Sequence, residues 1–507
     1  MTFKQVSILY DDQDESYIDL VKELRREFSA WSTISYAISI LGILGSVPAT
    51  LGAPLAAGGP ATAVWCWALG SLMALAIGSS VAELVSAYPT AGGMYFVAKY
   101  VVPPPQVPLF AWMQGWSNLL GQTAGVASVT YTVSQMVLAG VSMNYSYSPT
   151  PVHTVVLAIF LLILLGLVCS RSTKTLHRIV FWFAPINILA SLVICLVLLR
   201  SPNQQPFTWV FTHFTDGSGY GSKLFSFLLG FISVAWTMTD YDGTTHMSEE
   251  THDAATLGPR AIQTAVIISG FLGWILTVCL CRHLTDFDAI MNSSTGLPAA
   301  QIFLNVAGPS VGSLMWAMAI LVQSFTACSA MLADTRMVYA FARDEALPFS
   351  EILSEINTQT LTPVNSVIFV VIFSILLTTI ALASTKTATT IFSITAPALD
   401  LSYVAVILAH RLYRHRVPFV AGPFTLGKWT PVVNWVSVFW VLFISTVLFF
   451  PPSVPVTWEN MNYGFGVGSG IALFAWLWWR VDANGKYTGP RTADFQSIPQ
   501  SDYDPLE

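Results

Sequence analysis

Residues 225–259 read FSFLLGFISVAWTMTDYDGTTHMSEETHDAATLGP. The stretch begins with the apolar character of a membrane helix and then meets Asp240 and Asp242 before its hydrophobic length is used up. A carboxylate inside a bilayer is costly, so it needs water, a cation or a partner. A helix that loses its apolar pattern at mid-depth is tolerated only where its freed backbone groups line a cavity or are covered by protein. We therefore expect a binding site here, formed by Trp236, Thr237, Thr239 and Asp240.

The composition is that of a polytopic membrane protein. Hydrophobic residues fill 54% of the 507 positions, charged residues only 10%, and the mean hydropathy is +0.62. Soluble domains carry about a quarter charged residues. The net charge of −6 lies mainly in the two tails and gives no indication of nucleic-acid binding. The six cysteines have no metal-type spacing, so we expect packed free thiols and neither a metal nor a cofactor.

Twelve apolar stretches suit a hydrocarbon core about 30 Å thick, which needs about 20 residues per helix. We therefore expect an all-α membrane domain over residues 31–480, a polar tail over 1–30 without a cleaved signal peptide, and a second tail over 481–507. The expected spans are 31–57, 61–85, 108–140, 152–170, 179–199, 224–246, 261–283, 309–341, 364–384, 389–410, 431–450 and 463–480. The fourth and fifth have the uniform apolar pattern of lipid-facing helices.

The basic residues predict the orientation of these spans. With the N-terminus inside, eighteen of the 22 Lys and Arg residues fall in cytosolic segments, and the outside keeps only Arg200, Lys223, Arg282 and Lys386. Cytosolic loops carry the excess of positive charge, so both tails are expected in the cytosol. The two N-x-S/T sequons, at Asn144 and Asn292, both fall in predicted outside loops, where glycosylation would occur.

The first expected span is also interrupted, because residues 28–60 read FSAWSTISYAISILGILGSVPATLGAPLAAGGP. Gly42, Gly45, Pro48 and Gly52 lie in its middle. In a helix interior Gly costs about 1 kcal/mol and Pro about 3 kcal/mol. Interrupted first and sixth spans hold matching places in two halves of five helices, the pattern of an inverted-repeat secondary transporter. The alternative is that these residues only pack or kink the helices.

Three motifs add a family resemblance: AELVSAYPTAGGMYFVAKY at 82–100, DYDGTTHMSEETHDAATLGPRAI at 240–262 and TRMVYAFARDEALP at 335–348. With the twelve spans, they resemble the amino acid–polyamine–organocation superfamily, and within it the fungal amino acid/choline transporter family of GABA and choline permeases. The resemblance implies a 5+5 inverted-repeat, leucine-transporter-like core with broken helices 1 and 6. Spans 1, 2, 6 and 7 would rock against the rest. One departure is Asp240, where the family pattern has a small residue, usually Gly.

The same resemblance implies a break in the first span between Gly42 and Ser46. There the amides of Ile43, Leu44 and Gly45 would meet a substrate carboxylate, if the substrate has one. The break would then hold the acidic end of the substrate.

Roles can be weighed for three residues of the sixth span. An aromatic face such as Trp236 would cap the pocket or hold an ammonium by cation–π attraction of about 0.5 to 2 kcal/mol, although ordinary packing also explains it. Asp240 is the better candidate for the substrate ammonium or a proton. Asp242 matches the family Asp and is a candidate to pin the broken helix to a neighbour.

The sequence also offers candidate residues for gating and for ion coupling. Glu83 is a candidate for an inner-gate ion pair with a basic residue such as Arg260 or Arg336, or else a surface-facing carboxylate at a helix end. In sodium-coupled relatives of this fold, hydroxyls of the first and eighth spans hold the ion, and Ser324 and Thr326 are loosely placed for that. The fifth span has no Lys that could act as a proton switch, so proton coupling follows from the fungal resemblance alone.

Several polar residues follow the sixth-span break. They could form a metal cluster or a gate, but a solvated helix end explains them equally well, and no second His cluster completes a metal site. They are His246, Glu249, Glu250, His252 and Asp253.

We therefore expect a proton-coupled permease that moves a small amino compound through the lipid bilayer. An amino acid or GABA-like substrate comes first, and choline or a polyamine second. The plasma membrane is the expected location, and the vacuolar membrane is the alternative. Outside the sixth-span group, the sequence offers no convergent nucleophile and base for an enzyme, and two broken helices suit alternating access better than a channel. A transport-fold nutrient sensor stays an alternative, although tails of about 30 residues do not favour it.

Overall fold

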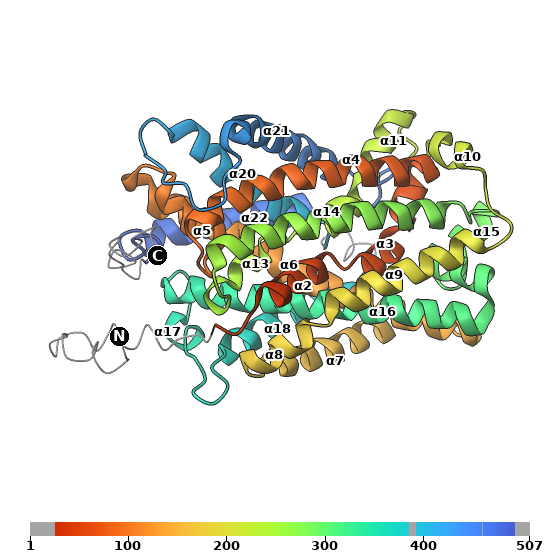
Figure 1. Ribbon diagram of the computed structural model, residues 1–507, viewed down its shortest axis with the longest axis horizontal. Helices are drawn as coiled ribbons and strands as arrows, with labels where there is room; N and C mark the ends of the chain where they lie inside the picture. Colours follow the sequence, from red (N-terminus) through yellow and green to blue (C-terminus); the bar gives the residue numbers. More distant parts are fainter. Residues whose placement is uncertain (1–25, 385–391, 459, 492–507) are drawn as a thin grey trace, which may run out of the picture.

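The computed structural model describes residues 26–384, 392–458 and 460–491, which form a long bundle of α-helices (Figure 1). Across these ranges no β-strand is formed, and only two isolated bridges occur, Phe28 with Thr251 and Asn484 with Tyr487. Most of the two predicted tails, and the start of the tenth expected span at 389–391, lie outside the described residues.

Each of the twelve expected spans contains helix. The bounds are α2 Ala30–Leu41, α3 Ile43–Thr50, α4 Gly52–Ala87, α5 Gly93–Val97, α6 Val107–Asn144, α7 Pro151–Cys169, α8 Thr173–Val180, α9 Phe183–Arg200, α10 Phe207–Thr212, α11 Lys223–Leu229, α12 Phe231–Thr237, α13 Gly243–His246, α14 Ala254–Cys281, α15 Phe287–Met291, α16 Pro298–Arg343, α17 Ser350–Leu353, α18 Val364–Thr379, α20 Thr395–Tyr413, α21 Thr430–Leu448 and α22 Gly464–Trp478.

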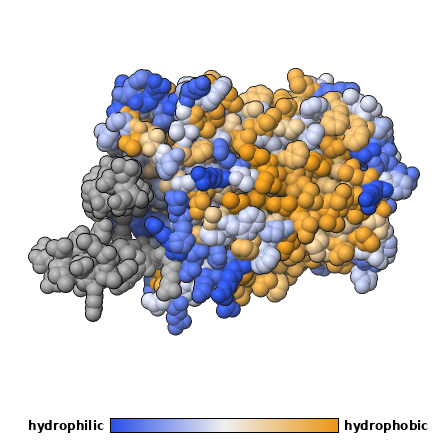
Figure 2. Space-filling view, viewed as in Figure 1, coloured by the Kyte–Doolittle hydropathy of each residue, from blue (hydrophilic) through white to orange (hydrophobic). Residues whose placement is uncertain are grey.

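The protein is an integral, multi-pass membrane protein. Among the described residues, nine helical segments are long and apolar enough to cross a bilayer, and Lys223–Thr237 is a shorter apolar helix. The visible face carries a broad band of apolar side chains between two polar ends (Figure 2). The count of twelve spans and the inverted repeat stay predictions.

The helices α7 and α9 lie at the periphery of the bundle. In their most apolar stretches, only 33% of Pro151–Cys169 (α7) and 39% of Thr173–Arg200 (α8 and α9) is buried inside the protein, against 83% for Ala30–Thr50. This difference agrees with the expectation that the fourth and fifth spans face lipid and that the first lies in the core.

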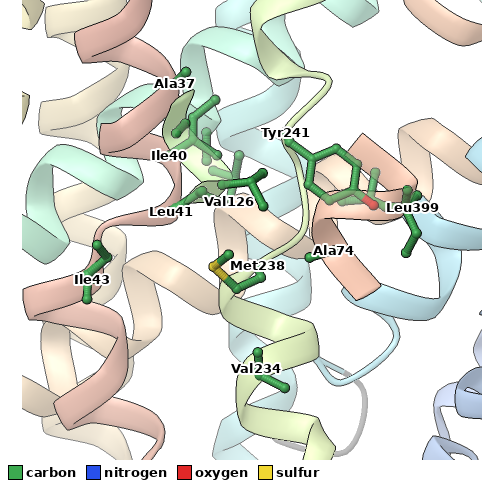
Figure 3. Packing of buried hydrophobic residues seen from close by; sticks show 14 of the residues in the cluster. Ala37, Ile40, Leu41, Ile43, Ala74, Val126, Val234, Met238, Tyr241 and Leu399 are labelled. Carbon is green, nitrogen blue, oxygen red and sulfur yellow. The ribbon is translucent and has the colours of Figure 1, made fainter. Parts of the chain in front are cut away.

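The first and sixth spans are both broken. The first is interrupted at a single residue, because Gly42 has φ 44° and ψ 52° between α2 and α3. The predicted break between Gly42 and Ser46 was therefore too wide. The sixth is open over residues 238–242, between the end of α12 and the start of α13. Buried apolar side chains hold the two breaks in one core, with Ile40 and Ile43 around one and Met238 and Tyr241 on the other (Figure 3).

Two Gly-Pro pairs interrupt α4 and α16, each of which consists of two helices that meet at a kink. Gly59 has φ 80° inside α4, and Gly308 has φ 71° inside α16. Only Gly adopts this backbone readily, and a Pro immediately after it is preorganised to start the next helix. The first pair separates the first and second expected spans, and Pro309 opens the eighth.

Both ends of the described chain lie at the same end of the bundle. The amides of Glu27 and Phe28 each donate to the Glu250 carbonyl at 3.0 Å. The amide of Arg491 donates to Asp344 Oδ1 at 3.2 Å, immediately after α16. We call this end, where α5, α13 and α17 also lie, the tail end (Figure 1). An even number of spans explains why the two ends share a side.

The two sequons lie at the opposite end. Asn144 closes α6, and its Nδ2 donates to Ser313 Oγ at 2.9 Å. Asn292 follows α15 and is exposed. This arrangement is the one that the predicted orientation requires, and which end faces the cytosol stays a prediction.

Candidate functional site

A cavity of about 30 Å³ lies where the two breaks meet α6, α16 and α20. Six of the residues that the sequence predicted for the site line it: Ser46, Trp236, Thr237, Thr239, Asp240 and Thr326. A volume near 30 Å³ is the share of one water molecule. An amino compound would therefore enter only after the walls separate.

Asp240 is the one charged side chain among the described residues that line this cavity. Its Oδ1 accepts a hydrogen bond from Gln122 Nε2 of α6 at 2.6 Å. Its backbone has φ 61°, in the left-handed region that Gly adopts most easily and Asp tolerates better than most residues. Asp is therefore accommodated at this position of the break at a lower cost than most other side chains.

Asp242 lies deeper and joins the break to two neighbouring helices. Its Oδ2 accepts from Asn118 Nδ2 of α6 at 3.3 Å, and the Tyr403 hydroxyl of α20 donates to its Oδ1. His246 Nε2 lies 3.5 Å from the same Oδ2. This is the geometry expected of a residue that pins the broken helix, and its part in gating stays a prediction.

The break of the first span is in direct contact with α16. Thr326 Oγ1 donates to the Ser39 carbonyl at 2.9 Å. A Cβ built on Gly42 would lie 1.7 Å from that same Oγ1, a distance no side chain can adopt. Gly42 is thus required twice, by its positive φ and by the closeness of Thr326.

Gly45 is required by a second close contact with α16. Its Cβ would lie 2.3 Å from Gln323 Oε1. The same oxygen accepts a hydrogen bond from Ser46 Oγ at 3.0 Å. The small residues of the first span therefore let α3 approach the eighth span, in addition to breaking the helix.

The predicted carboxylate site at the amides after Gly42 needs correction. The Leu44 amide donates to Asn187 Oδ1 of α9 at 3.3 Å, and the Gly45 amide donates to the Gly42 carbonyl at 2.9 Å. Both amides therefore already have acceptors within the protein. The Gly45 amide has one because α3 begins directly after Gly42. Ile43, the first residue of α3, is fully buried in the apolar core.

Trp236 lines the cavity from the last turn of α12. Its Nε1 donates to Ser128 Oγ of α6 at 3.2 Å. The indole is therefore oriented by a hydrogen bond and presents its ring to the cavity, which is the arrangement needed to cap a substrate.

The two hydroxyls predicted on the eighth span behave differently. Thr326 donates a hydrogen bond to the first span. Ser324 Oγ donates to the Ile320 carbonyl of its own helix instead, and Ser324 does not line the cavity. The hydroxyls of Ser39 and Ser329 are hydrogen-bonded to each other across the same interface. Ser324 is thus not brought to the break.

Sequence reasoning missed four polar residues around the breaks: Gln122, Gln323, Ser39 and Ser329. Helical spacing carried a signal for part of this set, because residues three apart share a face. Gln323, Thr326 and Ser329 follow that spacing, whereas Ser324 lies about 100° from Gln323 around the helix axis, on the side away from the other two. The contacts of Gln122 and Ser39 depend on how separate helices pack, which spacing within one helix does not show.

The three sequence motifs meet at the tail end. Arg336 Nε donates to Glu250 Oε1 at 2.8 Å, and both side chains are fully buried. Arg343 makes two hydrogen bonds of 3.0 Å to Glu249, whose Oε1 also accepts from the Ala91 amide at 3.1 Å. Burial raises the pKa of the Glu249 carboxyl, but the Arg343 guanidinium more than offsets this, so that pKa lies below its ordinary value.

Glu83 does not form the predicted ion pair with Arg260 or Arg336. Its Oε1 accepts from Thr425 Oγ1 and Thr430 Oγ1, each at 2.8 Å, and from the Leu426 amide at 3.0 Å. These donors belong to the turn that opens α21, where a carboxylate satisfies free amides and the helix dipole. The wrong prediction arose because sequence does not show that this turn covers the end of α4.

The polar residues after the sixth-span break act as connectors. His246 Nδ1 lies 2.7 Å from the Ala91 carbonyl, so α13 is tied to the loop before α5. Through the ranges that the structure describes, no three His, Cys, Asp or Glu side chains gather into a metal-binding group. The gate interpretation fits Glu249 and Glu250, whose partners lie on the eighth span.

Comparisons with known proteins identify the family of this chain. The family model described as amino acid permease matches residues 28–472. An uncharacterized amino-acid permease of Schizosaccharomyces pombe is 41% identical over 95% of this chain and 90% of its own length. Amino-acid permease 2 of Neurospora crassa is 35% identical, over 92% of this chain and 87% of its own. The GABA-specific permease of Saccharomyces cerevisiae is 29% identical, over 95% and 86%.

These relatives are named as permeases, not as enzymes, and the match to the family model includes both broken spans and all three motifs. The resemblance noted in the sequence is thereby confirmed. The chain belongs to the amino acid permease family and is a transmembrane transporter of that class.

Proposed function

We propose that this protein is a secondary active permease that couples the uptake of a small amino compound to a proton by alternating access. The observation that carries the proposal is the position of Asp240. Its carboxylate lies in the uncoiled segment of the sixth span, opposite the break of the first, and lines the cavity between them. A charged group at such a site is functional by default, because a purely structural one would be too costly.

The lining of the cavity favours a substrate with a primary or secondary ammonium group. Among the described lining residues Asp240 supplies the charge, and none is basic. The Gln122 amide now donates to Asp240 Oδ1, and an ammonium N–H can take the place of that donor. Choline has a quaternary nitrogen without N–H, so its charged group cannot donate a hydrogen bond to the carboxylate. An amino acid or a GABA-like compound is therefore the first candidate, and a polyamine the second.

The tail end supplies the gate in this proposal. The pairs Arg336–Glu250 and Arg343–Glu249 join the eighth span to the segment that follows the sixth-span break. Rocking of the broken helices away from α16 would separate these charges and open the cavity towards the tail end. With both tails in the cytosol, as the basic residues predict, this gate faces inward at the plasma membrane.

The test is uptake of radiolabelled GABA, alanine, arginine, putrescine and choline by transport-deficient cells that express the chain, at pH 5 and pH 7.5. The proposal expects saturable uptake of at least one amino compound, faster at pH 5, together with poor uptake of choline. Cells that express a Gly42→Trp variant, with the break filled, are the matched blank. Surface-expressed protein that takes up none of the five compounds would overturn the proposal in favour of a sensor.

A further inference from the structure

Asp334 of α16 differs from every other aspartate around the breaks. Its side chain is completely buried, and neither carboxylate oxygen has a hydrogen-bond partner among the described residues. Asp400 accepts from the Tyr241 and Thr239 hydroxyls at 3.2 and 3.3 Å. Asp240 and Asp242 also have donors from other helices. Asp334 alone in this group has none, and the site described above does not use it.

Among the described residues, no basic side chain forms an ion pair with Asp334 either. Thr123 of α6 faces it without reaching hydrogen-bonding geometry. His246, after the sixth-span break, and Asp240, within that break, are the titratable groups that face it from the elements packed against α16. Arg336 lies two residues further on, but its guanidinium is committed to Glu250. The one candidate counter-charge among these groups, His246, lies 3.5 Å from Asp242, so an ionised Asp334 would be buried without a partner of its own, which is far more costly than a neutral acid.

The position of Asp334 ties it to the moving part of the proposed transporter. The preceding residue, Ala333, lies against Gly243 at the start of α13, where an added Cβ would come within 3.3 Å of the Ala333 Cβ. The Arg336–Glu250 pair is less than one helical turn away on the same helix. Movement of α13 away from α16 would therefore expose Asp334 and open the gate in one step.

We propose that Asp334 is the group that carries the coupled proton. When the cavity is open to the outside, the carboxylate takes a proton from hydronium. One O–H bond of the hydronium breaks, water leaves with that electron pair, and the new carboxyl O–H bond neutralises the side chain. Closure around the substrate then buries a neutral acid, as in the present conformation. Separation of α13 from α16 at the tail end admits water, the O–H bond breaks, and the proton leaves as hydronium with the electron pair kept by the carboxylate.

This inference rests on the proposed function, because a proton carrier has a role only in a permease. It goes further because it assigns proton coupling to a residue other than Asp240, the residue proposed to bind the substrate. Substrate binding and proton coupling are then separable by mutation. A permease that used Asp240 for both would lose them together.

The test compares the full-length wild type with Asp334→Asn in proteoliposomes, using radiolabelled GABA, alanine and arginine. Asn has the shape of the neutral acid but cannot release a proton. We expect exchange of internal for external substrate to stay within threefold of wild type. An inward proton gradient should stimulate wild-type uptake at least tenfold and the variant less than twofold, and substrate-driven acidification of the lumen should vanish in the variant.

Asp344→Asn, which removes another buried carboxylate at the end of the same helix, is the matched control and should keep the full stimulation. Gradient-driven accumulation by Asp334→Asn equal to that of wild type would overturn the assignment. Absence of any transport by wild type would instead contradict the proposed function, and an independent measurement still tests the charge state.

That measurement is the infrared carbonyl band of protonated carboxylic acids at pH 7. We expect wild type to show one more such component than Asp334→Asn, and Asp334→Glu to shift it. Should the Asn variant fail to fold, the comparison of wild type with the Glu variant remains. Identical bands in all folded variants would show that Asp334 is ionised, and the inference would fail.

Discussion

Arg336 and Glu250 form an ion pair at 2.8 Å in which both side chains are completely shielded from solvent. Each residue comes from a different sequence motif, and between them they join the eighth span to the segment after the sixth-span break. One oxygen of Glu250 and one nitrogen of Arg336 have no further partner among the described residues. A buried pair of this kind is costly to break from one side, because the remaining charge is left uncompensated.

We therefore predict that Glu250→Gln destabilises the protein more than the double variant Glu250→Gln with Arg336→Met. Removal of one partner of a buried pair costs about 3 to 5 kcal/mol because the other charge is left uncompensated, and the double variant leaves no such charge. The measurement is thermal unfolding of the purified protein in detergent, followed by tryptophan fluorescence. A single variant as stable as wild type would show that the pair does not hold the tail end closed.

Gly42→Ala should reduce uptake at least tenfold. The new Cβ would meet Thr326 Oγ1 at 1.7 Å, and φ 44° is unfavourable for Ala by roughly 1 to 2 kcal/mol. Gly221→Ala is the control, since Gly221 has φ 72° but no heavy atom within 4 Å of its Cβ. Equal losses in both variants would mean that backbone strain alone matters and that the contact with α16 does not.

Asp240→Asn should raise the KM for an ammonium-bearing substrate at least tenfold while surface expression stays normal. The amide keeps the shape of the side chain but removes the charge that attracts the ammonium. Asp240→Gly removes the charge and also the cost of a positive φ at a non-glycine residue. The Gly variant should therefore be more stable than Asp240→Asn and should show uptake that is equally low. Unchanged uptake kinetics in the Asn variant would contradict the proposal that Asp240 binds the substrate.

Glu83→Gln should lower the melting temperature and leave the KM for substrate unchanged. Glu83 accepts three hydrogen bonds from the turn that opens α21, and the neutral amide oxygen is a weaker acceptor by about 1 kcal/mol. Thermal unfolding and uptake are measured on the same preparation. A changed KM with an unchanged melting temperature would restore the original gate interpretation.

Asp344 should make stability depend on pH. Burial raises the pKa of its carboxyl to about 6, although Arg343, the Arg491 amide and the Tyr95 hydroxyl act in the opposite direction. The folded state therefore binds this proton more tightly than the unfolded state, so the contribution is present at low pH and is lost as pH rises through about 6. A shift of about two units corresponds to at most about 3 kcal/mol.

The stability of wild type relative to Asp344→Asn should accordingly fall from about pH 4 to about pH 6 and level off above about pH 7, as measured by chemical or thermal unfolding. Glu345→Gln, at an exposed neighbour that pairs with Arg491, is the control and should show no such trend. A difference between wild type and Asp344→Asn that grows with pH would contradict the sign.

The orientation can be tested at the sequons. If the end opposite the tails is outside, Asn144→Gln and Asn292→Gln should each remove one glycan, seen as a step in mobility on a denaturing gel. Both asparagines are exposed, which glycan addition requires. Two results together would contradict the predicted topology. The gel mobility of wild type would not change on enzymatic deglycosylation, and a C-terminal epitope would be accessible from outside intact cells.

Much of the fold could be read from the chain because its cause is local. Apolar runs of the length of a bilayer predict membrane helices, and each expected span contains helix. Gly and Pro at 42–48 and the polar run after Trp236 predicted the two broken spans, since both features weaken a helix wherever it packs. Even the boundary between the first two spans was close, because Gly59 and Pro60 turn the chain by their own backbone preferences.

The partners of the site residues were predicted less well. The pairing of Glu83 and the place of Ser324 were wrong, and two of the three amides predicted to meet the substrate already have acceptors within the protein. Each depended on a residue far away in the chain, such as Thr425 for Glu83 or Asn187 for the Leu44 amide. Sequence spacing constrains contacts within a helix but says little about which face of another helix lies opposite.

The sequence by itself determined that this chain lies in a membrane, that two of its helices are broken, and that carboxylates interrupt one of them, because hydrophobicity and backbone preference are properties of short segments. Only the tertiary structure decided that Arg336 meets Glu250, that Gln122 meets Asp240, and that Asp334 meets no partner among the described residues. The physical reason is that the cost of a buried polar group is set by what packs around it, and in this protein those neighbours come from distant parts of the chain.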